Sequence, residues 1–469
     1  MEDVTIVKDK EGSYRDSVAT ISKEGKRNFI NPKKPKGRLY KLRTWFSIFY
    51  LVVFFTLPFI KVHGEPLLMF NILERKFIIF GMVFWPQDFF IFGIAMLTFI
   101  VFVILFTVVF GRIFCGWACP QTIFMEMVFR KIEYWIDGDS AKQKLLKEMP
   151  WNAEKIRKRA VKFVVFFSIS FILANFFLAY LISMDKLLEY IKTPASHIGT
   201  LISLSIFTSV FFFVYWWFRE QACLVVCPYG RLQGVLLDSN SILVAYDHVR
   251  GEPRSKHAKT EEKHGDCIDC LACVRVCPTG IDIRNGTQLE CVNCTACIDA
   301  CDAIMTGIHK PTGLVRYASE NSISEGKKLI FTRRIKAYTG VLTALLLLLV
   351  FLLVSREDLD ARLMRTSGMS YSTLPDGSIA NLYNLKLANK THADIPFTLK
   401  LENAGGEIEY VGSVDMVVKK EDYSHLQFFV KLQPGDIKGW KTLLKIGMYE
   451  KGKKIKTMTA KFIGPEVYK

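Results

Sequence analysis

The apolar residues of this 469-residue chain are gathered in long blocks instead of recurring at a regular spacing. A helix needs about 20 mainly apolar residues to cross a bilayer. Five blocks approach or exceed that length, and the spans are expected at residues 44–62, 88–110, 161–183, 198–218 and about 337–354. The pattern therefore predicts a helical membrane protein with several spans.

Two shorter apolar patterns lie between these spans. Residues 77–88 are too short to cross the bilayer, so they are predicted to form an interfacial or re-entrant segment with Trp85 at the interface. Residues 123–136 place apolar side chains against charged ones such as Arg130 and Glu133. A helix lying on the membrane surface, with these charges on its polar face, is expected there.

The last part of the chain changes character. In residues 360–469, short stretches of alternating apolar and polar residues are separated by turn signals such as those at 375–377 and 434–436. This alternation predicts a small β-sandwich. The segment has no cysteine and its histidines are His392 and His425, so we expect a folding or partner-docking module without a metal site.

The formal net charge of +17 is explained by membrane orientation rather than by nucleic-acid binding, because the basic residues flank the apolar blocks. Residues 1–43, expected to be a mostly flexible tail, are basic, and so are the regions 111–160 and 219–336. The short loops after the first and third spans are not. By the positive-inside rule, the N-terminus and both cysteine-rich regions are predicted to be cytoplasmic, which leaves the C-terminal segment outside.

Residues 267–301 hold eight of the twelve cysteines, in two runs that each read C-x2-C-x2-C-x3-C. This is the spacing of bacterial two-cluster ferredoxins, in which the fourth cysteine of each run ligates the other cluster. A pair of zinc knuckles is the alternative, but zinc usually takes two C-x2-C pairs separated by a longer loop. The expected 4Fe–4S ligands are Cys267, Cys270, Cys273 and Cys301 for the first cluster, and Cys291, Cys294, Cys297 and Cys277 for the second.

The remaining cysteines form two C-x3-C-P pairs, each directly after an even-numbered span, and they are Cys115, Cys119, Cys223 and Cys227. The order of span, pair and amphipathic stretch occurs twice, which is a weak internal repeat. Cysteines four apart share one face of a helix. Together the two pairs would make a four-thiolate redox site at the membrane surface, suited to copper or to a third cluster. The alternative is that these cysteines are ordinary buried packing residues.

Other cofactors find little support. All eight histidines lie outside the predicted spans, so a membrane haem held by two imidazoles is not expected. His63 and His197 lie at the outer ends of spans and are predicted to be interface residues. No nucleotide-binding glycine motif follows a strand pattern, so a bound flavin or nicotinamide is unsupported.

Several motifs resemble those of the CcoG/FixG/RdxA family of bacterial inner-membrane proteins, accessory to cytochrome c oxidase. They are GRIFCGWACPQT, QACLVVCPYGRLQ, the ferredoxin run through CVNCTACIDACDAIM, LVRYASEN and NLYNLKLANKT. The resemblance covers nearly the whole chain after residue 40. It implies a polyferredoxin with two 4Fe–4S clusters, an immunoglobulin-like C-terminal domain, and a role in maturing a high-affinity haem–copper oxidase through reduction of Cu(II) to Cu(I).

The pattern and the resemblance together predict a mixed multi-domain membrane protein. The expected domains are a basic cytoplasmic tail at 1–43, a four-span membrane domain with both C-x3-C-P motifs at 44–235, a cytoplasmic ferredoxin-type domain at 236–333, a fifth membrane helix at 334–356 and a periplasmic immunoglobulin-like β-sandwich at 360–469.

The expected function is one-electron transfer. A cytoplasmic electron donor reduces the two clusters, and the four-cysteine site then reduces Cu(II), since thiolates favour the softer Cu(I). The expected partners are the lipid bilayer, that donor, copper ions or a copper chaperone, and oxidase assembly factors, but no nucleic acid. One alternative is an electron-transfer subunit resembling the NapH quinol dehydrogenases, although the fifth span and the outer β-domain count against it. Another is an assembly scaffold whose clusters serve stability or sensing.

Overall fold

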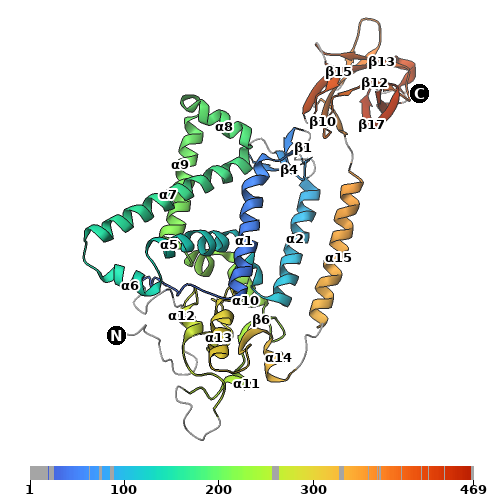
Figure 1. Ribbon diagram of the computed structural model, residues 1–469. Coiled ribbons are helices and arrows are strands. Elements are labelled where there is room, and N and C mark those ends of the chain that lie inside the picture. Colours follow the sequence, from blue (N-terminus) through green and yellow to red (C-terminus); the bar gives the residue numbers. More distant parts are fainter. Residues whose placement is uncertain are drawn as a thin grey trace. The chain divides into compact units, whose positions relative to one another are not determined.

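The computed structural model divides into two compact units, Met1–Ile60 with Phe92–Leu349, and Lys61–Ile91 with Val350–Lys469 (Figure 1). Each unit is described by itself. The residues that the structure describes are 20, 26–62, 64–72, 76–84, 89–255, 264–326, 332–356, 359–366, 368, 371–391, 393–412, 415–420, 422–437 and 439–465.

Five helices are long and apolar enough to cross a membrane, as the sequence predicts. They are Arg38–Phe59 (α1, Arg38–Thr56, with η2, Leu57–Phe59), Phe89–Phe110 (α2), Ala153–Ile182 (α7), Ile198–Phe218 (α9, Ile198–Phe213, with η6, Val214–Phe218) and Arg333–Val354 (α15). Helix α7 begins before the expected residue 161 because the side chain of Asn152 accepts a hydrogen bond from the Lys155 N–H at 2.9 Å and caps its first turn.

Aromatic contacts hold the spans of the first unit together. The Tyr180 hydroxyl of α7 donates to the Phe54 carbonyl of α1 at 2.7 Å. The rings of Phe163 on α7 and Phe212 on α9 meet edge to face, with centroids 5.0 Å apart. Such pairs contribute about 0.5–1.5 kcal/mol beyond the area they bury. This packing accounts for part of the chain's richness in phenylalanine.

The segment after the second span folds into five short helices, which are α3 (Ile113–Trp117), α4 (Pro120–Thr122), η4 (Ile123–Phe129), α5 (Arg130–Ile136) and α6 (Ser140–Glu148). The prediction that 123–136 lies on the membrane surface with a solvated charged face is wrong. Arg130 and Glu133 are 2% and 3% exposed, because they pair with charges from other elements. Beyond α7, α8 (Met184–Lys192) and η5 (Pro194–Ser196) lead to α9.

The region of the ferredoxin run is closed by a two-stranded antiparallel sheet of β6 (Leu243–Tyr246) and β7 (Val315–Ala318). Between these strands lie α11 (His248–Gly251), α12 (Ala272–Arg275), η8 (Ile283–Asn285) and α13 (Ala296–Gly307), and α14 (Glu320–Ser324) follows β7. The two strands bring the ends of the region together, so that both cysteine runs lie in one buried core with Ile281, Ile298 and Met305.

Part of the predicted tail packs against the first unit, where the Ser140 hydroxyl donates to the Asn31 carbonyl at 2.5 Å and the Tyr134 hydroxyl to the Pro32 carbonyl at 3.1 Å. The first helix begins at Arg38, so the prediction of a tail through residue 43 is wrong. The Asp299 carboxylate of α13 accepts hydrogen bonds from the N–H groups of Leu39 and Tyr40, at 3.1 and 2.7 Å. It thereby caps the N-terminus of the first membrane helix. Gly37 is required there, because a Cβ at that position would lie 2.2 Å from the Asp299 Cγ.

In the second unit, the described residues of the stretch predicted to be interfacial or re-entrant form two short strands and the turn between them. A short pair, β1 (Lys61–Val62) and β2 (Glu65–Pro66), precedes an antiparallel sheet of β3 (Leu68–Asn71), β4 (Lys76–Ile79) and β5 (Met82–Phe84). Met69, Ile78 and Val83 of this sheet are buried with Tyr423 packed against them. Trp85 and His63 lie outside the described residues.

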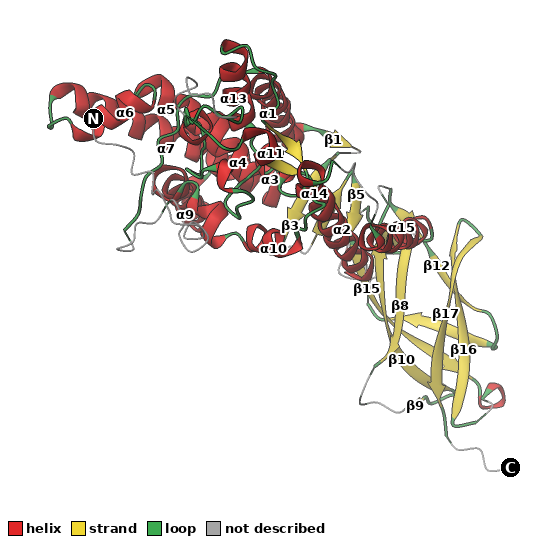
Figure 2. Ribbon diagram, turned by 90° about the horizontal axis from the view of Figure 1, so that it is seen from below, coloured by secondary structure: helices red, strands yellow, loops and turns green. Residues whose placement is uncertain are grey.

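The predicted C-terminal β-sandwich is confirmed (Figure 2). One sheet has the order β13-β15-β10-β8 and the other β12-β16-β17. The strands are β8 (Leu359–Arg365), β9 (Ser372–Thr373), β10 (Ile379–Asn389), β11 (Ile395–Pro396), β12 (Thr398–Leu401), β13 (Gly406–Tyr410), β14 (Val417–Val418), β15 (Tyr423–Leu432), β16 (Lys441–Glu450) and β17 (Lys453–Ile463). Alternate residues such as Leu385, Phe428, Ile446 and Phe462 fill the core. His425 is exposed, and His392 lies outside the described residues.

Candidate metal centres

The two ferredoxin runs share an unusual backbone. In each run, the residue before and the residue after the second cysteine are left-handed, with φ of 51° and 59° at Asp269 and Leu271, and 53° and 64° at Asn293 and Thr295. A non-glycine residue in that region costs about 1–3 kcal/mol, and such conformations turn successive N–H groups toward a common centre. The repeated strain therefore indicates that each loop wraps a negatively charged group.

The structure brings together the thiols of the first predicted set. Burial, together with the neighbouring thiols of Cys270 and Cys267, raises the pKa of Cys301 to about 12. Burial also raises the pKa of Cys273 to about 12, with Cys301 and Cys270 adding to the shift. The cysteine at the end of the second run thus lies beside the first run, as the exchanged-ligand pattern requires.

The second predicted set is grouped in the same way. Burial raises the pKa of Cys297 well above its ordinary value, and Cys294, Cys291 and Cys277 raise it further, with a smaller effect from Cys273 of the first set. A cavity is lined by these cysteines and by apolar side chains; its lining includes Cys277, Cys291, Cys294, Cys297, Cys273, Val244, Ile281 and Ile283. The two sets are therefore neighbours.

These residues fit 4Fe–4S clusters better than single metal ions. Among the residues that the structure describes, no three His, Cys, Asp or Glu side chains lie close enough together to hold one metal ion. A zinc ion bound at about 2.3 Å would need such closeness, whereas the thiolates of a cluster bind separate irons and stand further apart. Burial raises the pKa of Cys294 to about 11 and contributes most to raising that of Cys301 to about 12, so these two thiols are protonated without metal and release protons when iron binds.

The two C-x3-C-P pairs repeat each other in backbone as well as in sequence. Four residues before the first cysteine of each pair the chain is left-handed, with φ of 55° at Gly111 and 49° at Arg219. The N–H groups of Cys119 and Cys227 each donate five residues back at 2.9 Å, to the Phe114 and Ala222 carbonyls. The internal repeat inferred from sequence therefore extends to local structure.

The expectation that each pair lies on one face of a helix is wrong. The first cysteines lie in α3 (Ile113–Trp117) and η7 (Ala222–Val226). The second cysteines, Cys119 and Cys227, have extended backbone and precede new helices, α4 and α10 (Pro228–Leu236), that begin at prolines. Proline suits the first position of a helix because its missing N–H is not needed there. Each pair therefore straddles a break between helices.

Both pairs nevertheless meet at one place, here called the four-cysteine site (Cys115, Cys119, Cys223 and Cys227). Burial, together with the nearby thiols of Cys119, Cys115 and Cys227, raises the pKa of Cys223 to about 12. The Cys115 thiol donates to the Gln233 Oε1 of α10 at 3.1 Å. The predicted juxtaposition of the two pairs is thus present in the structure.

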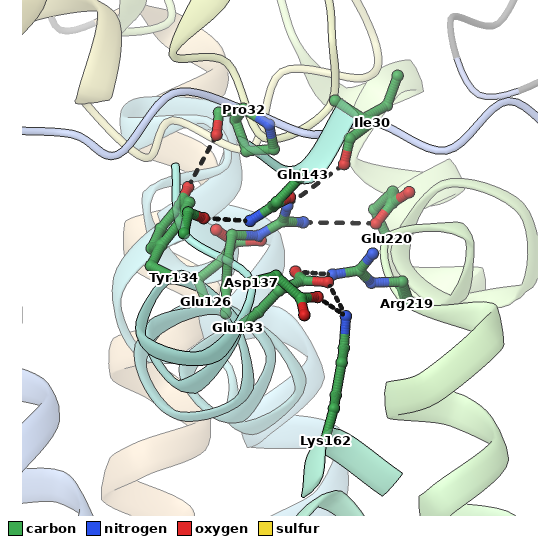
Figure 3. Close-up of polar contacts among 12 residues, drawn as sticks. Ile30, Pro32, Glu126, Glu133, Tyr134, Asp137, Gln143, Lys162, Arg219 and Glu220 are labelled. Carbon is green, nitrogen blue, oxygen red and sulfur yellow. Dashed lines mark hydrogen bonds and ion pairs between the residues drawn. The ribbon is translucent and has the colours of Figure 1, made fainter. Parts of the chain in front are cut away.

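A buried ionic network fixes the two pairs relative to each other (Figure 3). It joins the helices after the first pair to α7 and to the residues before the second pair, and comprises Glu126, Arg130, Glu133, Asp137, Lys162, Arg219 and Glu220. The Lys162 Nζ lies 2.5 Å from Glu133 and 2.7 Å from Asp137, and Arg219 also pairs with Glu133. Arg130 lies 2.9 Å from Glu126 and 3.5 Å from Glu220.

Electrostatics within this network favour the charged forms. Burial alone would raise the pKa of Glu133, but the cations of Arg219, Lys162 and Arg130 outweigh it and hold the pKa well below its usual range. Sequence reasoning missed the network because it placed Arg130 and Glu133 on a solvated face. A usable signal was the spacing of Glu126, Arg130, Glu133 and Asp137, which puts four charges on one face of an otherwise apolar helical segment.

The four-cysteine site touches the second ferredoxin run. Cys115 belongs to one apolar cluster with Val292 and Cys294. A Cβ on Gly116 would lie 2.4 Å from the Val292 carbonyl oxygen and 2.8 Å from that of Asn293, so the glycine permits two backbones to meet. This contact, here called the junction, gives a short path between the second cysteine set and the four-cysteine site.

Comparisons with known proteins agree with this arrangement. The family described as 4Fe-4S dicluster domain matches residues 218–320, and the one described as 4Fe-4S binding domain matches residues 92–139. The family described as the IG-like fold at the C-terminus of FixG matches residues 349–465. The fold and these matches define a membrane iron–sulfur electron-transfer protein that carries two 4Fe–4S clusters and an immunoglobulin-like domain.

Curated relatives are similar over most of their length. Protein RdxB of Cereibacter sphaeroides is 35% identical over 79% of this chain and 81% of its own. Protein RdxA of the same organism is 34% identical over 80% and 83%, and nitrogen fixation protein FixG of Rhizobium meliloti is 30% identical over 87% and 87%. The chain belongs to the FixG/RdxA family. A crystal structure of a FixG-related protein from Vibrio parahaemolyticus aligns with 23% of this chain and 97% of that one, at 17% identity and a TM-score of 0.20.

Proposed function

We propose that this protein carries electrons from a cytoplasmic donor, through the two cysteine sets of the ferredoxin runs, to the four-cysteine site, where Cu(II) is reduced to Cu(I) for the copper centre of a haem–copper oxidase. The observation that carries the proposal is the junction. Cys115 of the four-cysteine site shares an apolar cluster with Cys294 of the second set. Three groups of redox-competent thiols thus lie in succession.

The proposed ligands are Cys267, Cys270, Cys273 and Cys301 for one cluster, and Cys277, Cys291, Cys294 and Cys297 for the other. When bound, such clusters supply one-electron storage and release. The chain buries four of these cysteines and half-buries the other four, and apolar side chains such as Val244 and Ile281 line the cavity of the second set and limit the access of water. Its basic loops support a cytoplasmic position for the ferredoxin region and an outer position for the β-sandwich.

The copper step is a balanced one-electron reduction. Cu(II) accepts one electron from a reduced cluster and becomes Cu(I), and the cytoplasmic donor replaces that electron. Thiolates stabilise the product because Cu(I) is the softer ion. Binding displaces protons from thiols such as Cys223, whose pKa burial raises to about 12. The Gln233 side-chain oxygen already accepts the Cys115 S–H and orients that thiol.

A second candidate role for the four-cysteine site is a third iron–sulfur cluster that relays electrons elsewhere. The family described as 4Fe-4S binding domain matches residues 92–139, which include Cys115 and Cys119. Iron content separates the two roles, since two clusters give about eight irons per chain and three give about twelve.

The test is Cu(II) reduction by anaerobically reduced, full-length protein, followed with a Cu(I)-specific chelator. Wild type should form Cu(I), whereas Cys115→Ser and Cys223→Ser should each lose this activity and keep about eight irons. The double variant should be little worse than either single one, because residues that act as a unit are not additive.

Three results would contradict the copper role. Wild-type activity in both single variants would indicate that the four cysteines are ordinary packing residues. Quinol oxidation by wild-type protein without Cu(I) formation would instead favour a quinol dehydrogenase role, and neither activity would favour an assembly scaffold.

A further inference from the structure

Two arginines at the junction are buried without a counter-charge. Arg43 of α1 and Arg112 before α3 are each 3% exposed. Within the described part of the chain neither lies within 4.0 Å of a carboxylate, and the Arg43 Nη2 lacks even a hydrogen-bond partner. A buried unpaired cation is unfavourable. A fold that retains two of them at one place implies an anionic group beside them.

Both arginines connect the four-cysteine site to the second cysteine set. The Arg112 Nε donates to the Gln233 Oε1 at 2.9 Å, the same oxygen that accepts from Cys115. Its Nη1 donates to the Leu289 carbonyl, just before Cys291. The Arg43 Nε donates to the Gly116 carbonyl at 2.7 Å.

Both positive charges lie close to the second cysteine set. Arg112 donates to the Leu289 carbonyl, two residues before Cys291. Arg43 lines one cavity with Cys294, and Glu126, which also lines it, is paired with Arg130 at 2.9 Å. Hydrogen bonds act in the same direction, because the Thr279 hydroxyl lies 3.3 Å from the Cys277 sulfur and the N–H of Thr279 also donates to it. Positive charge and donated hydrogen bonds both stabilise an anionic, electron-rich centre.

The surroundings of the first set differ. Its nearby cation, Arg284, is neutralised by Asp269 at 2.5 Å and Asp282 at 2.6 Å. Another acidic residue, Asp302, directly follows the ligand Cys301 in the chain. Acidic side chains destabilise an added electron, so the first set lacks the positive bias of the second.

We propose that the second cysteine set has a higher reduction potential than the first, and that Arg43 and Arg112 are the positioning residues that set this difference. Electrons then run from the first set to the second and arrive beside the four-cysteine site. The inference rests on the ligand sets proposed above, but it does not depend on copper being the final acceptor.

The test is an anaerobic potentiometric titration of full-length protein, without copper, followed by EPR. Two reduction waves are expected. Arg112→Gln and Arg43→Gln should each lower the electron-uptake constant of the upper wave at least tenfold, which is 59 mV for a one-electron couple. The lower wave should move by less than half of that shift. Arg112→Lys and Arg43→Lys retain the charge and should restore most of the upper potential.

The matched control is Arg275→Gln. Arg275 is exposed and donates to the Cys270 carbonyl at 2.6 Å. Like Arg43 and Arg112 it lies next to a cysteine loop, but water screens its charge. The Arg275→Gln variant should change the electron-uptake constant of neither wave by more than twofold.

Coincident waves in wild type would overturn the inference. So would an unchanged upper wave in both glutamine variants at wild-type iron content, or lysine variants that behave like the glutamine ones. The copper role would be contradicted by a different result, the absence of Cu(I) formation by wild type. That result would not affect the inferred difference between the two reduction potentials.

Discussion

Gly116→Ala tests the junction with the smallest possible change. The added methyl group would lie 2.4 Å from the Val292 carbonyl oxygen, and both of its nearest contacts are backbone atoms that cannot rotate away. The two backbones must therefore separate by about 0.6 Å to reach 3.0 Å, the shortest distance that real Cβ atoms show. Overpacking of this kind costs about 1–3 kcal/mol.

The helix propensity of alanine offsets part of this cost. Gly116 lies in α3, where alanine is better than glycine by about 0.5–1 kcal/mol. A net cost of roughly 1–2 kcal/mol remains, which corresponds to about a 5- to 30-fold fall in the population with the junction closed. Reoxidation of the reduced protein by Cu(II) should slow by about that factor, with iron content unchanged.

Gly93→Ala is the matched control. Gly93 lies in α2 with nothing within 4 Å of a built Cβ, so the same substitution meets open space. Its reoxidation rate, followed by stopped-flow absorbance, should equal that of wild type. A wild-type rate for Gly116→Ala at wild-type iron content would refute the view that electrons cross this contact.

Three further predictions concern the ligands, the ionic network and the topology. Cys270→Ala should remove the first cluster and disturb the second, since the two runs exchange their fourth ligands; unchanged iron content and EPR would contradict the ligand sets. Glu133→Gln leaves Lys162 and Arg219 short of a buried partner and should destabilise the fold by about 3–5 kcal/mol, seen as a lower thermal midpoint. Glu154→Gln, at an exposed pair that water screens, should leave the midpoint unchanged. Reporter fusions at Lys142 and after the final residue should give opposite signals, and the same signal from both would refute five spans.

Local signals were enough to predict much of the fold. Each membrane span is one uninterrupted apolar block, and the β-sandwich is a run of alternating strands, so both patterns are complete within the segment that forms the element. The cysteine sets also follow from spacing, because the distance along the chain decides which thiols can reach one centre. The four-cysteine site was inferred from repetition of C-x3-C-P after two spans.

The features that were missed depend on partners distant in sequence. The local sequence around Arg130 is that of a surface residue, and only the fold brings Glu220 to 3.5 Å from it. Asn31 and Pro32 were assigned to a tail because nothing local shows that Ser140 and Tyr134 donate to their carbonyl groups. Likewise, nothing local shows that Ile78 lies in a sheet with Tyr423 packed against it. In each case tertiary contacts override the local pattern.

The most direct measurement of the central claim is a single turnover without added reductant. Full-length protein is reduced anaerobically, freed of reductant, and mixed with Cu(II) and a Cu(I) chelator, while cluster absorbance and Cu(I) are recorded together. Two one-electron clusters should yield about two Cu(I) per chain as the cluster absorbance recovers, and the Cys115→Ser/Cys223→Ser variant should keep its iron, remain reduced and yield none. Equal Cu(I) yields and rates from the two proteins would contradict a role for the four-cysteine site in copper reduction.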